Sequence, residues 1–411
     1  MSRGTNRIGL LVTDVAYETT EARVRWLELA VDEATERGIL EKDIDIVVET
    51  TVGLPLGSAF DASRSWRRLV EDEGVLAVIG PTHADTGVSM LPTIDAGRCP
   101  TMLLGGHPGL VGHWTFNVQA GDMITDAYLA MAWCHQRGHQ RVALIRDTAW
   151  HGQHWLESCE DAAARLGLDI LRVETIGASL SDLRNPEPQQ NAAARRSLER
   201  IRELAPDAVV MIASLSAVAY AQELHKMRWD IPRVAGTLAF ESSRLPGVTQ
   251  YWDGWVGVAT WDESNPTLMD FLARWKRKYG SHLGVFREDI GSVYFDAMRL
   301  ILEGIARARV LNRDGVRDGL EAVHRLPACS GASSTTMGFG PWDHRAYKGP
   351  DTSLLRRQQG STTEGSTAEA WLSELWPNRP SPAGEAPSPT SLDCSSGVVR
   401  TAVARCDGLR A

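Results

Sequence analysis

The sequence has few cysteines, no excess of basic residues and no long hydrophobic run. Its six cysteines are scattered over 411 residues without C-x-x-C spacing, so the pattern indicates neither a zinc knuckle nor a disulfide framework. Acidic residues outnumber basic ones, 52 against 43, and the net charge of −9 argues against a nucleic-acid partner. No apolar stretch is long enough to cross a membrane. We therefore expect a protein with no direct membrane insertion.

The N-terminus lacks the features of a secretory signal. Residues 1–6 lead straight into an apolar stretch at 8–12, with no charged region, apolar core or small-residue cleavage site. As written, the sequence predicts a cytoplasmic protein. A start placed downstream of a true signal peptide would make the protein periplasmic or extracellular instead.

Motifs for catalysis and cofactor binding are also missing. There is no G-x-x-x-x-G-K-[ST] phosphate loop and no G-x-S-x-G nucleophile elbow. His135 and His139 are four residues apart near an expected helix end, but the glutamate of H-E-x-x-H is absent. We therefore expect no cofactor, no metal and no enzyme activity.

Short apolar runs that alternate with helical patterns are what the chain does contain. Residues 75–104 show the unit most clearly, because an apolar run ends at Gly80-Pro81, a helical pattern follows, and a second apolar run ends at Gly105-Gly106. Two parallel strands joined by a helix explain this pattern. In open α/β sheets, small ligands bind beyond the carboxyl ends of the strands.

The alternation extends over most of the chain and falls into two sets, which predicts two parallel sheets covered by helices. We expect strands at 8–12, 44–48, 75–79, 99–104, 114–118, 142–145, 171–175, 208–212, 234–236 and 255–260. We expect helices at 21–37, 62–72, 123–137, 153–166, 192–204, 217–227, 267–279, 289–307 and 313–323. A weak strand pair at 333–339 and 353–357 follows, and the end of the chain predicts a disordered tail.

The order of these pieces resembles the type I periplasmic-binding-protein family, in particular its branched-chain-amino-acid and amide receptor branch with a leucine-binding-protein-like domain. The resemblance covers about residues 7–360 and depends on the order and spacing of several stretches. These are RIGLLV, VLAVIGPTHADTGVSMLPTIDAGRCPTMLLGG, WTFNVQAGD, RVALIRDTAWHGQHWLESCEDAAARLGLDI and DIGSVYFDAMRLILEGIARA.

The resemblance implies an α/β fold of two Rossmann-like lobes, each a parallel sheet flanked by helices, joined by a three-segment hinge. Lobe one would contain residues 1–119 and 262–330, and lobe two 120–261 and 331–365, with 366–411 as the disordered tail. The crossing segments would lie near 119–122, 259–265 and 329–333. A ligand would bind in the cleft, and the lobes would close around it by hinge bending.

The loop after the Gly-Pro strand would hold part of the ligand in lobe one. In the family this loop supplies a serine hydroxyl and backbone N–H groups to a carboxylate, at a helix N-terminus suited to anions. Ala84 stands in the serine position here, so Thr82 or Thr86 would have to supply the hydroxyl. His83 and Asp85 add groups that the family pattern does not require, although Asp85 could equally serve only to cap the following helix.

The loop after the next strand contains Gly105, Gly106 and His107, where glycines would let a ligand approach the backbone closely. Alternatively, the glycines serve only the turn and His107 lies at the rim. Tyr17, in the first loop, would form a side wall.

In lobe two, Trp150 and His151 occupy the turn that usually shows Tyr-Gly, with His151 in place of the tyrosine. Trp150 would cover the ligand or else pack under its helix. Ser214 would complete the rim. Glu241 would pair with a ligand ammonium group, or be an ordinary exposed loop glutamate.

The resemblance favours a non-catalytic solute-binding protein that captures an amino acid, amide or related small molecule and passes it to an ABC permease. The alternative is a cytosolic ligand sensor of amide-receptor type that controls a regulatory protein. A third hypothesis is an α/β enzyme in which His83, Asp85, His107 and His151 act as an acid–base set. Fold alone cannot support chemistry, so this third hypothesis is the least favoured.

Overall fold

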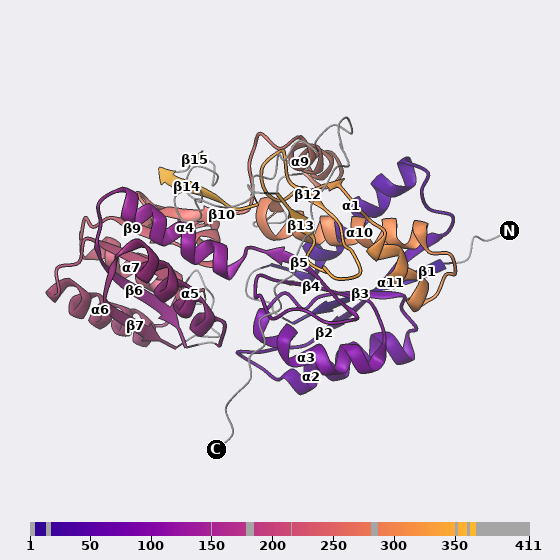
Figure 1. The fold of residues 1–411 in the computed structure, drawn as a ribbon, viewed down its shortest axis with the longest axis horizontal. Helices are drawn as coiled ribbons and strands as arrows, with labels where there is room; N and C mark the ends of the chain where they lie inside the picture. The colour runs from indigo at the N-terminus through magenta and orange to yellow at the C-terminus, as the bar shows by residue number, and fades with distance from the viewer. Residues whose placement is uncertain are drawn as a thin grey trace, which may run out of the picture. The chain divides into compact units, whose positions relative to one another are not determined.

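The computed structural model describes residues 5–13, 18–148, 150–177, 185–214, 216–280, 287–349, 352–359 and 362–366. Two separate sheets organise this part of the chain (Figure 1). Apart from residue 366, the tail expected at 366–411 lies outside the described residues.

The first sheet is entirely parallel and has the strand order β2-β1-β3-β4-β5. Buried apolar side chains on both sides of β1, β3 and β4 explain why these strands appear in the sequence as unbroken apolar runs. Its strands are β1 (Thr5–Val12), β2 (Asp43–Thr50), β3 (Ala77–Ile79), β4 (Thr101–Gly105) and β5 (Thr115–Ala120).

Helices cover both faces of the first sheet. Leu10 and Met102 point to the side of α1 and α10, and Leu11 and Leu103 to the side of α2 and α3. Trp66 of α2 is fully buried on the second side. The helices are α1 (Thr20–Glu36), α2 (Ala59–Arg67, continued by η1, Arg68–Asp72), α3 (Ala84–Gly97), α9 (Pro266–Tyr279), α10 (Ser292–Arg307, preceded by η4, Arg287–Gly291) and α11 (Arg313–Glu321).

The second sheet has the order β15-β14-β10-β9-β8-β6-β7. The five strands β10, β9, β8, β6 and β7 run parallel to one another, and β14 and β15 add an antiparallel edge. The strands are β6 (Arg141–Asp147), β7 (Asp169–Ile176), β8 (Ala208–Ile212), β9 (Arg233–Ala235), β10 (Val256–Ala259), β14 (Leu354–Gln359) and β15 (Thr362–Ser366).

The second sheet is also covered on both faces. Val142 and Val210 pack towards α4 and α5, and Ala143 and Val209 towards α6 and α7. The helices are α4 (Met123–Gln136), α5 (Trp150–Leu166), α6 (Pro188–Glu203), α7 (Ala217–Lys226) and α8 (Thr237–Glu241), with short 3-10 turns η2 (Ser242–Arg244) and η3 (Thr249–Trp252).

Both stretches of the weak strand pair expected at 333–339 and 353–357 contain strands, but the two strands do not pair with each other. β12 (Thr336–Met337) pairs with β11 (Leu326–Pro327) and β13 (Tyr347–Lys348) in a small third sheet. The 353–357 stretch belongs instead to β14, which pairs with β10 and β15. Strands of two residues carry too little side-chain pattern to reveal their partners.

The chain passes between the two main sheets more than once. It leaves the first sheet after β5 to form α4, and it returns after β10 to form α9, which packs on α1. It reaches the second sheet again at β14, after the small third sheet. These passages are what a two-lobed α/β molecule requires, and below we call the two halves lobe one and lobe two after their sheets.

Candidate functional site

Two strand ends of lobe one lie side by side and form one wall of the candidate site. β3 and β4 are parallel neighbours, so their carboxyl ends meet at one edge of the sheet. The end of β4 has little room for a side chain, because a Cβ on Gly105 would lie 3.0 Å from the Cα of Ala84. A Cβ on Gly106 would lie 2.5 Å from the carbonyl oxygen of Gly121. The two glycines therefore let the loop lie directly against its neighbours.

A narrow cavity opens between this wall and helices of lobe two. Six of the residues expected from the sequence line it: Thr82, His83, Ala84, Gly105, Gly106 and His151. Three further residues line it that the sequence did not point to, namely Met123, Leu238 and Ile290. These three are apolar residues in or beside helices, so nothing in the sequence separates them from core residues.

Asp85 connects the two lobes next to the cavity. It lies in the first turn of α3, and its Oδ1 accepts hydrogen bonds from the backbone N–H and from Nδ1 of His151, each at 3.0 Å. The alternative role of Asp85 as a cap for α3 is wrong, because His83 holds the N-cap position and no side chain caps that end. Asp85 instead binds the first turn of α5 in lobe two.

The other ring nitrogen of His151 faces into lobe two. His151 Nε2 lies 3.3 Å from Ser214 Oγ, and the Ser214 hydroxyl donates to Asp147 Oδ2 at 2.7 Å. The hydroxyl of Ser216 donates to the other oxygen of Asp147. A chain of hydrogen bonds therefore runs from Asp85 through the imidazole to buried Asp147.

This chain resembles a Ser-His-Asp arrangement in composition only. The Ser214 proton is directed to Asp147 rather than to His151, so the imidazole cannot accept it without breaking that bond. Ser214 is also buried and is absent from the cavity lining. The arrangement fixes the orientation of His151 and favours holding a ligand over attacking one.

The charges around Asp85 keep its carboxylate ionised. Burial opposes ionisation, but the hydrogen bonds and charge of His151, together with the charge of His83, lower the pKa of Asp85 below its ordinary value. Ionised Asp85 can therefore bind the first turn of α5, where backbone N–H groups favour an anion.

His107 lies beside the cavity and forms a second contact between the lobes. Its ring stacks on Trp150 with 4.7 Å between centroids, and His154 meets the same ring edge-on at 4.4 Å. Burial and the neighbouring His154 lower the pKa of His107 to about 4. Trp150 is 45% exposed, so the alternative in which it packs under its helix is wrong.

Glu241 is buried rather than exposed. It ends the short helix α8 and does not lie in a loop. Within the described part of the chain its Oε2 has no hydrogen-bond partner. Burial, with Asp289 and Asp126 nearby, raises its pKa well above the ordinary value against the opposing charge of Arg244. Glu241 lies one helical turn after Leu238, which lines the cavity.

The two threonines differ in position. Thr82 lines the cavity and its hydroxyl lies 2.7 Å from the hydroxyl of Tyr294. Thr86 points away, because its hydroxyl donates to the carbonyl of Leu54. Thr82 is therefore the hydroxyl available to a ligand. Tyr17 lies outside the described residues.

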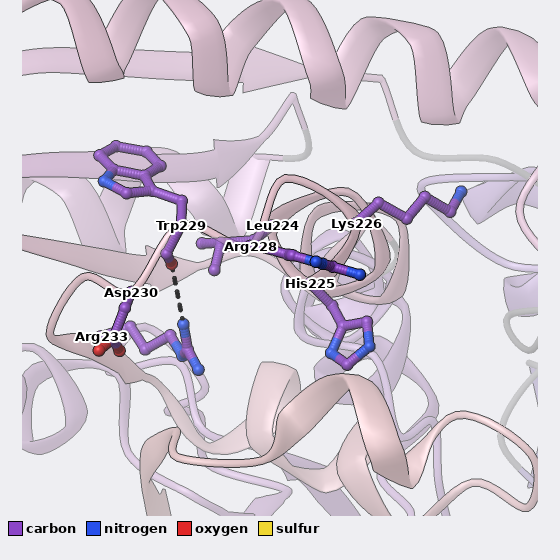
Figure 2. A pocket seen from close by; sticks show the side chains of 7 residues that line it. All are labelled: Leu224, His225, Lys226, Arg228, Trp229, Asp230 and Arg233. Carbon is purple, nitrogen blue, oxygen red and sulfur yellow. Dashed lines mark hydrogen bonds between the residues drawn. The ribbon is translucent and has the colours of Figure 1, made fainter.

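A second, more open hollow lies elsewhere on lobe two, at the end of α7 (Figure 2). The Arg233 side chain reaches the carbonyl of Trp229 there at 3.3 Å, as Figure 2 shows. Because β9 begins at Arg233, this hollow lies at the amino ends of the parallel strands. Ligands of such sheets bind at the opposite ends, so the cavity at His83 is the candidate site.

The part of the chain that the structure describes shows neither a metal-binding cluster nor a membrane span. No group of three His, Cys, Asp or Glu side chains in it could hold a metal ion. None of its helices has both the length and the apolar character needed to span a bilayer.

Sequence comparison identifies the family. The family described as periplasmic binding protein matches residues 7–349, which is most of the chain. The chain belongs to the periplasmic binding protein family. No curated protein matches it significantly.

Solved structures of this family share the two-lobed fold. A possible leucine/isoleucine/valine-binding protein from Rhodopirellula baltica SH 1 superposes with a TM-score of 0.72 at 13% identity, over 90% of this chain and 98% of that one. A branched-chain amino acid transporter binding protein from Streptococcus pneumoniae, in complex with isoleucine, gives 0.70 at 16% identity over 89% and 100%.

A solute-binding protein of an ABC transporter from R. palustris, in complex with benzoate, gives a TM-score of 0.68 at 16% identity, over 89% of this chain and 96% of that one. At such identities the likeness establishes the fold of this periplasmic binding protein and leaves its ligand open.

Proposed function

We propose that this protein captures a small polar solute, an amino acid, amide or related compound, in the cavity at His83 and delivers it to an ABC importer. One observation carries the proposal: the ends of β3 and β4 in lobe one and His151 in lobe two line the same cavity. A molecule bound there would contact both lobes, as hinge closure requires.

The wall of lobe one offers hydrogen-bond donors to an anionic or carbonyl group. The hydroxyl of Thr82 and the imidazole of His83 line the cavity. The N-terminus of α3 begins beside them at Ala84, where the first backbone N–H groups have no partner within the helix. Isoleucine and benzoate, the ligands of two structural neighbours, both carry a carboxylate.

Glu241 is the group that we propose for a ligand ammonium. A cation brought next to a buried neutral carboxyl favours its ionised form, so binding would lower the pKa of Glu241 and form a charged pair. We propose Tyr17 as a side wall. We also propose the lobe boundaries 1–119 with 262–330 and 120–261 with 331–365, except that the β12–β13 part of the small third sheet packs on lobe one.

A thermal-shift screen of amino acids, amides and small carboxylates tests the proposal. At least one compound should stabilise the protein, by about 2.7 kcal/mol at one hundred times its dissociation constant. Thr82→Ala and His83→Ala should each weaken that compound's binding about tenfold, because each removes a donor from the cavity wall.

Arg228→Ala is the matched control, because Arg228 belongs to the second hollow. It should leave binding unchanged. A library without any stabilising compound would contradict the proposal, as would a loss of binding in Arg228→Ala with none in His83→Ala. The importer role is tested by uptake of the identified compound in cells lacking this gene.

A further inference from the structure

The first turn of α5 is an anion site that the protein fills with its own carboxylate. His151 is the second residue of this 17-residue helix, so its backbone N–H has no partner within the helix. Asp85 Oδ1 accepts that N–H at 3.0 Å although it belongs to α3, on the other sheet. A carboxylate in this position also interacts favourably with the helix dipole.

The contact is held firmly on both sides. Asp85 and His151 are buried, and their side chains meet at a second hydrogen bond of 3.0 Å through Nδ1. The opposite nitrogen of the same ring is 3.3 Å from Ser214 Oγ. Because the Ser214 hydroxyl donates to Asp147, its oxygen is left to accept from Nε2–H. Each ring nitrogen of His151 therefore has a partner, Asp85 on one side and Ser214 on the other, so the imidazole is fixed between the two lobes.

A second contact between the same helix and lobe one lies nearby. His107 follows the cavity-lining Gly106, and its ring stacks on Trp150 of α5 at 4.7 Å. The first turns of α5 are therefore bound to lobe one at two points, both through side chains of the chain itself.

We propose that Asp85 is a built-in closing anion, a positioning residue that draws lobe two onto lobe one in the solute-free protein. The inference rests on the proposed function, because it concerns closure of the same cavity. Solute then binds to a cleft that is already largely closed, and affinity includes no large penalty for closing it. The carboxylate of Asp85 already occupies the first turn of α5, so the solute need not place a negatively charged group there.

Small-angle X-ray scattering of solute-free protein tests this inference. The wild type is compared with Asp85→Ala, which removes the carboxylate and leaves a good helix former in α3. The radius of gyration should increase in Asp85→Ala. Asp85→Asn, which keeps an acceptor but loses the charge, should give an intermediate value.

Asp95→Ala is the matched control. Asp95 lies in the same helix, but its carboxylate accepts from the backbone of Trp114 within lobe one. Its radius of gyration should equal that of the wild type. Circular dichroism melts of all variants confirm that each is folded before scattering is compared.

Saturating solute provides the second readout. It should compact Asp85→Ala back to the wild-type value and change the wild type little, and Asp85→Ala should bind solute about tenfold more weakly if its closed fraction falls to about one tenth. Equal radii for the wild type and Asp85→Ala, or equal compaction of both by solute, would overturn the inference. If no solute binds at all, the proposed function fails, while the solute-free comparison still decides the role of Asp85.

Discussion

At the scale of the residue, burial decides which titratable groups near the cavity carry charge. His107 shows this most clearly. Its Nδ1 accepts from the backbone N–H of Gly109 at 2.9 Å, so the proton of the neutral ring is on Nε2. Within the described part of the chain that Nε2 has no hydrogen-bond partner. A second proton on this ring would therefore place a charge in a buried site.

His107 makes stability depend on pH. Its pKa is about 4 in the folded protein and near 6.5 in an unfolded chain, so the unfolded state binds more protons between these values. The contribution of the neutral His107 ring to the free energy of unfolding is fully present above pH 6.5 and is lost as the pH falls towards 4. Between pH 7 and pH 5, the wild type should lose about 1–2 kcal/mol more than His107→Asn, measured by urea unfolding. Asparagine is chosen because its side-chain oxygen can still accept from Gly109.

The control for this experiment is His324→Asn, which removes an exposed imidazole. Its stability should follow the wild-type dependence on pH. If His107→Asn and the wild type lost the same stability on acidification, the assignment of the effect to His107 would be wrong.

At the scale of the element, helix N-termini are where this fold joins distant segments. Several are capped locally by a side chain just before the helix, as Asp122 caps α4. Two differ. α3 has no side-chain cap, and the first turn of α5 receives its carboxylate from the other lobe. Asn265 combines both types, because it caps α9 and binds a segment more than sixty residues away.

Asn265 provides a prediction that separates these two roles. Its Oδ1 accepts from the backbone of Thr267, while its Nδ2 donates to the carbonyl oxygens of Ala328, Cys329 and Gly331 at 3.0–3.1 Å. Asn265→Asp keeps the cap acceptor but turns a carboxylate towards three buried carbonyls. We expect a loss of about 2–3 kcal/mol in the free energy of unfolding, measured by urea denaturation.

Asn312→Asp is the corresponding control. Asn312 caps α11 through the N–H of Gly315 in an exposed position, and aspartate caps as well as asparagine. That variant should change stability by less than about 0.5 kcal/mol. Equal effects of the two substitutions would show that Asn265 acts only as a cap.

At the scale of the whole molecule, single buried side chains join segments that are far apart in the sequence. Asp296 in α10 is fully buried and accepts from the backbone N–H groups of Cys329 and Ser330 and from the hydroxyl of Tyr347. It also pairs with buried Arg299 at 3.1 Å. The small third sheet is thereby fixed to lobe one through the segment after β11 and through β13. Burial, opposed by Arg299 and these donors, raises the pKa of Asp296.

Removal of Asp296 should therefore affect the whole fold. Asp296→Ala leaves the Arg299 charge buried without this partner, and we expect a loss of about 3–5 kcal/mol in the free energy of unfolding. Asp270→Ala, which removes an exposed carboxylate paired with Arg274, should cost less than about 1 kcal/mol. Chemical denaturation of both variants at neutral pH gives the comparison, and similar losses would contradict the anchoring role of Asp296.

The alternation of strands and helices could be predicted because each strand of a sheet covered on both faces is a continuous apolar run. β8 matches the expected 208–212, and β4 and α9 begin or end within two residues of the expected bounds. The pairing of β12 and β14 could not be predicted, because two-residue strands and antiparallel edges are chosen by packing rather than by local pattern.

Part of the cavity could also be predicted from the sequence, since Thr82, His83 and Gly105 follow directly from the ends of two recognisable strands. Met123, Leu238 and Ile290 could not, because an apolar residue facing a cavity has the same local pattern as one in a core. The sequence left Asp85 as either a ligand-binding group or a cap of its helix. The structure shows a third role, a hydrogen bond to His151 of the other lobe.

The sequence by itself determined the α/β alternation and the strand ends that build one wall of the site, because these depend on local hydrophobic period and on turn residues. The family followed from the resemblance of several stretches in their order and spacing. The tertiary structure alone decided which groups meet across the cavity. Asp85 and His151 are 66 positions apart, in helices that flank different sheets, and only the folding of both lobes brings their side chains within hydrogen-bonding distance.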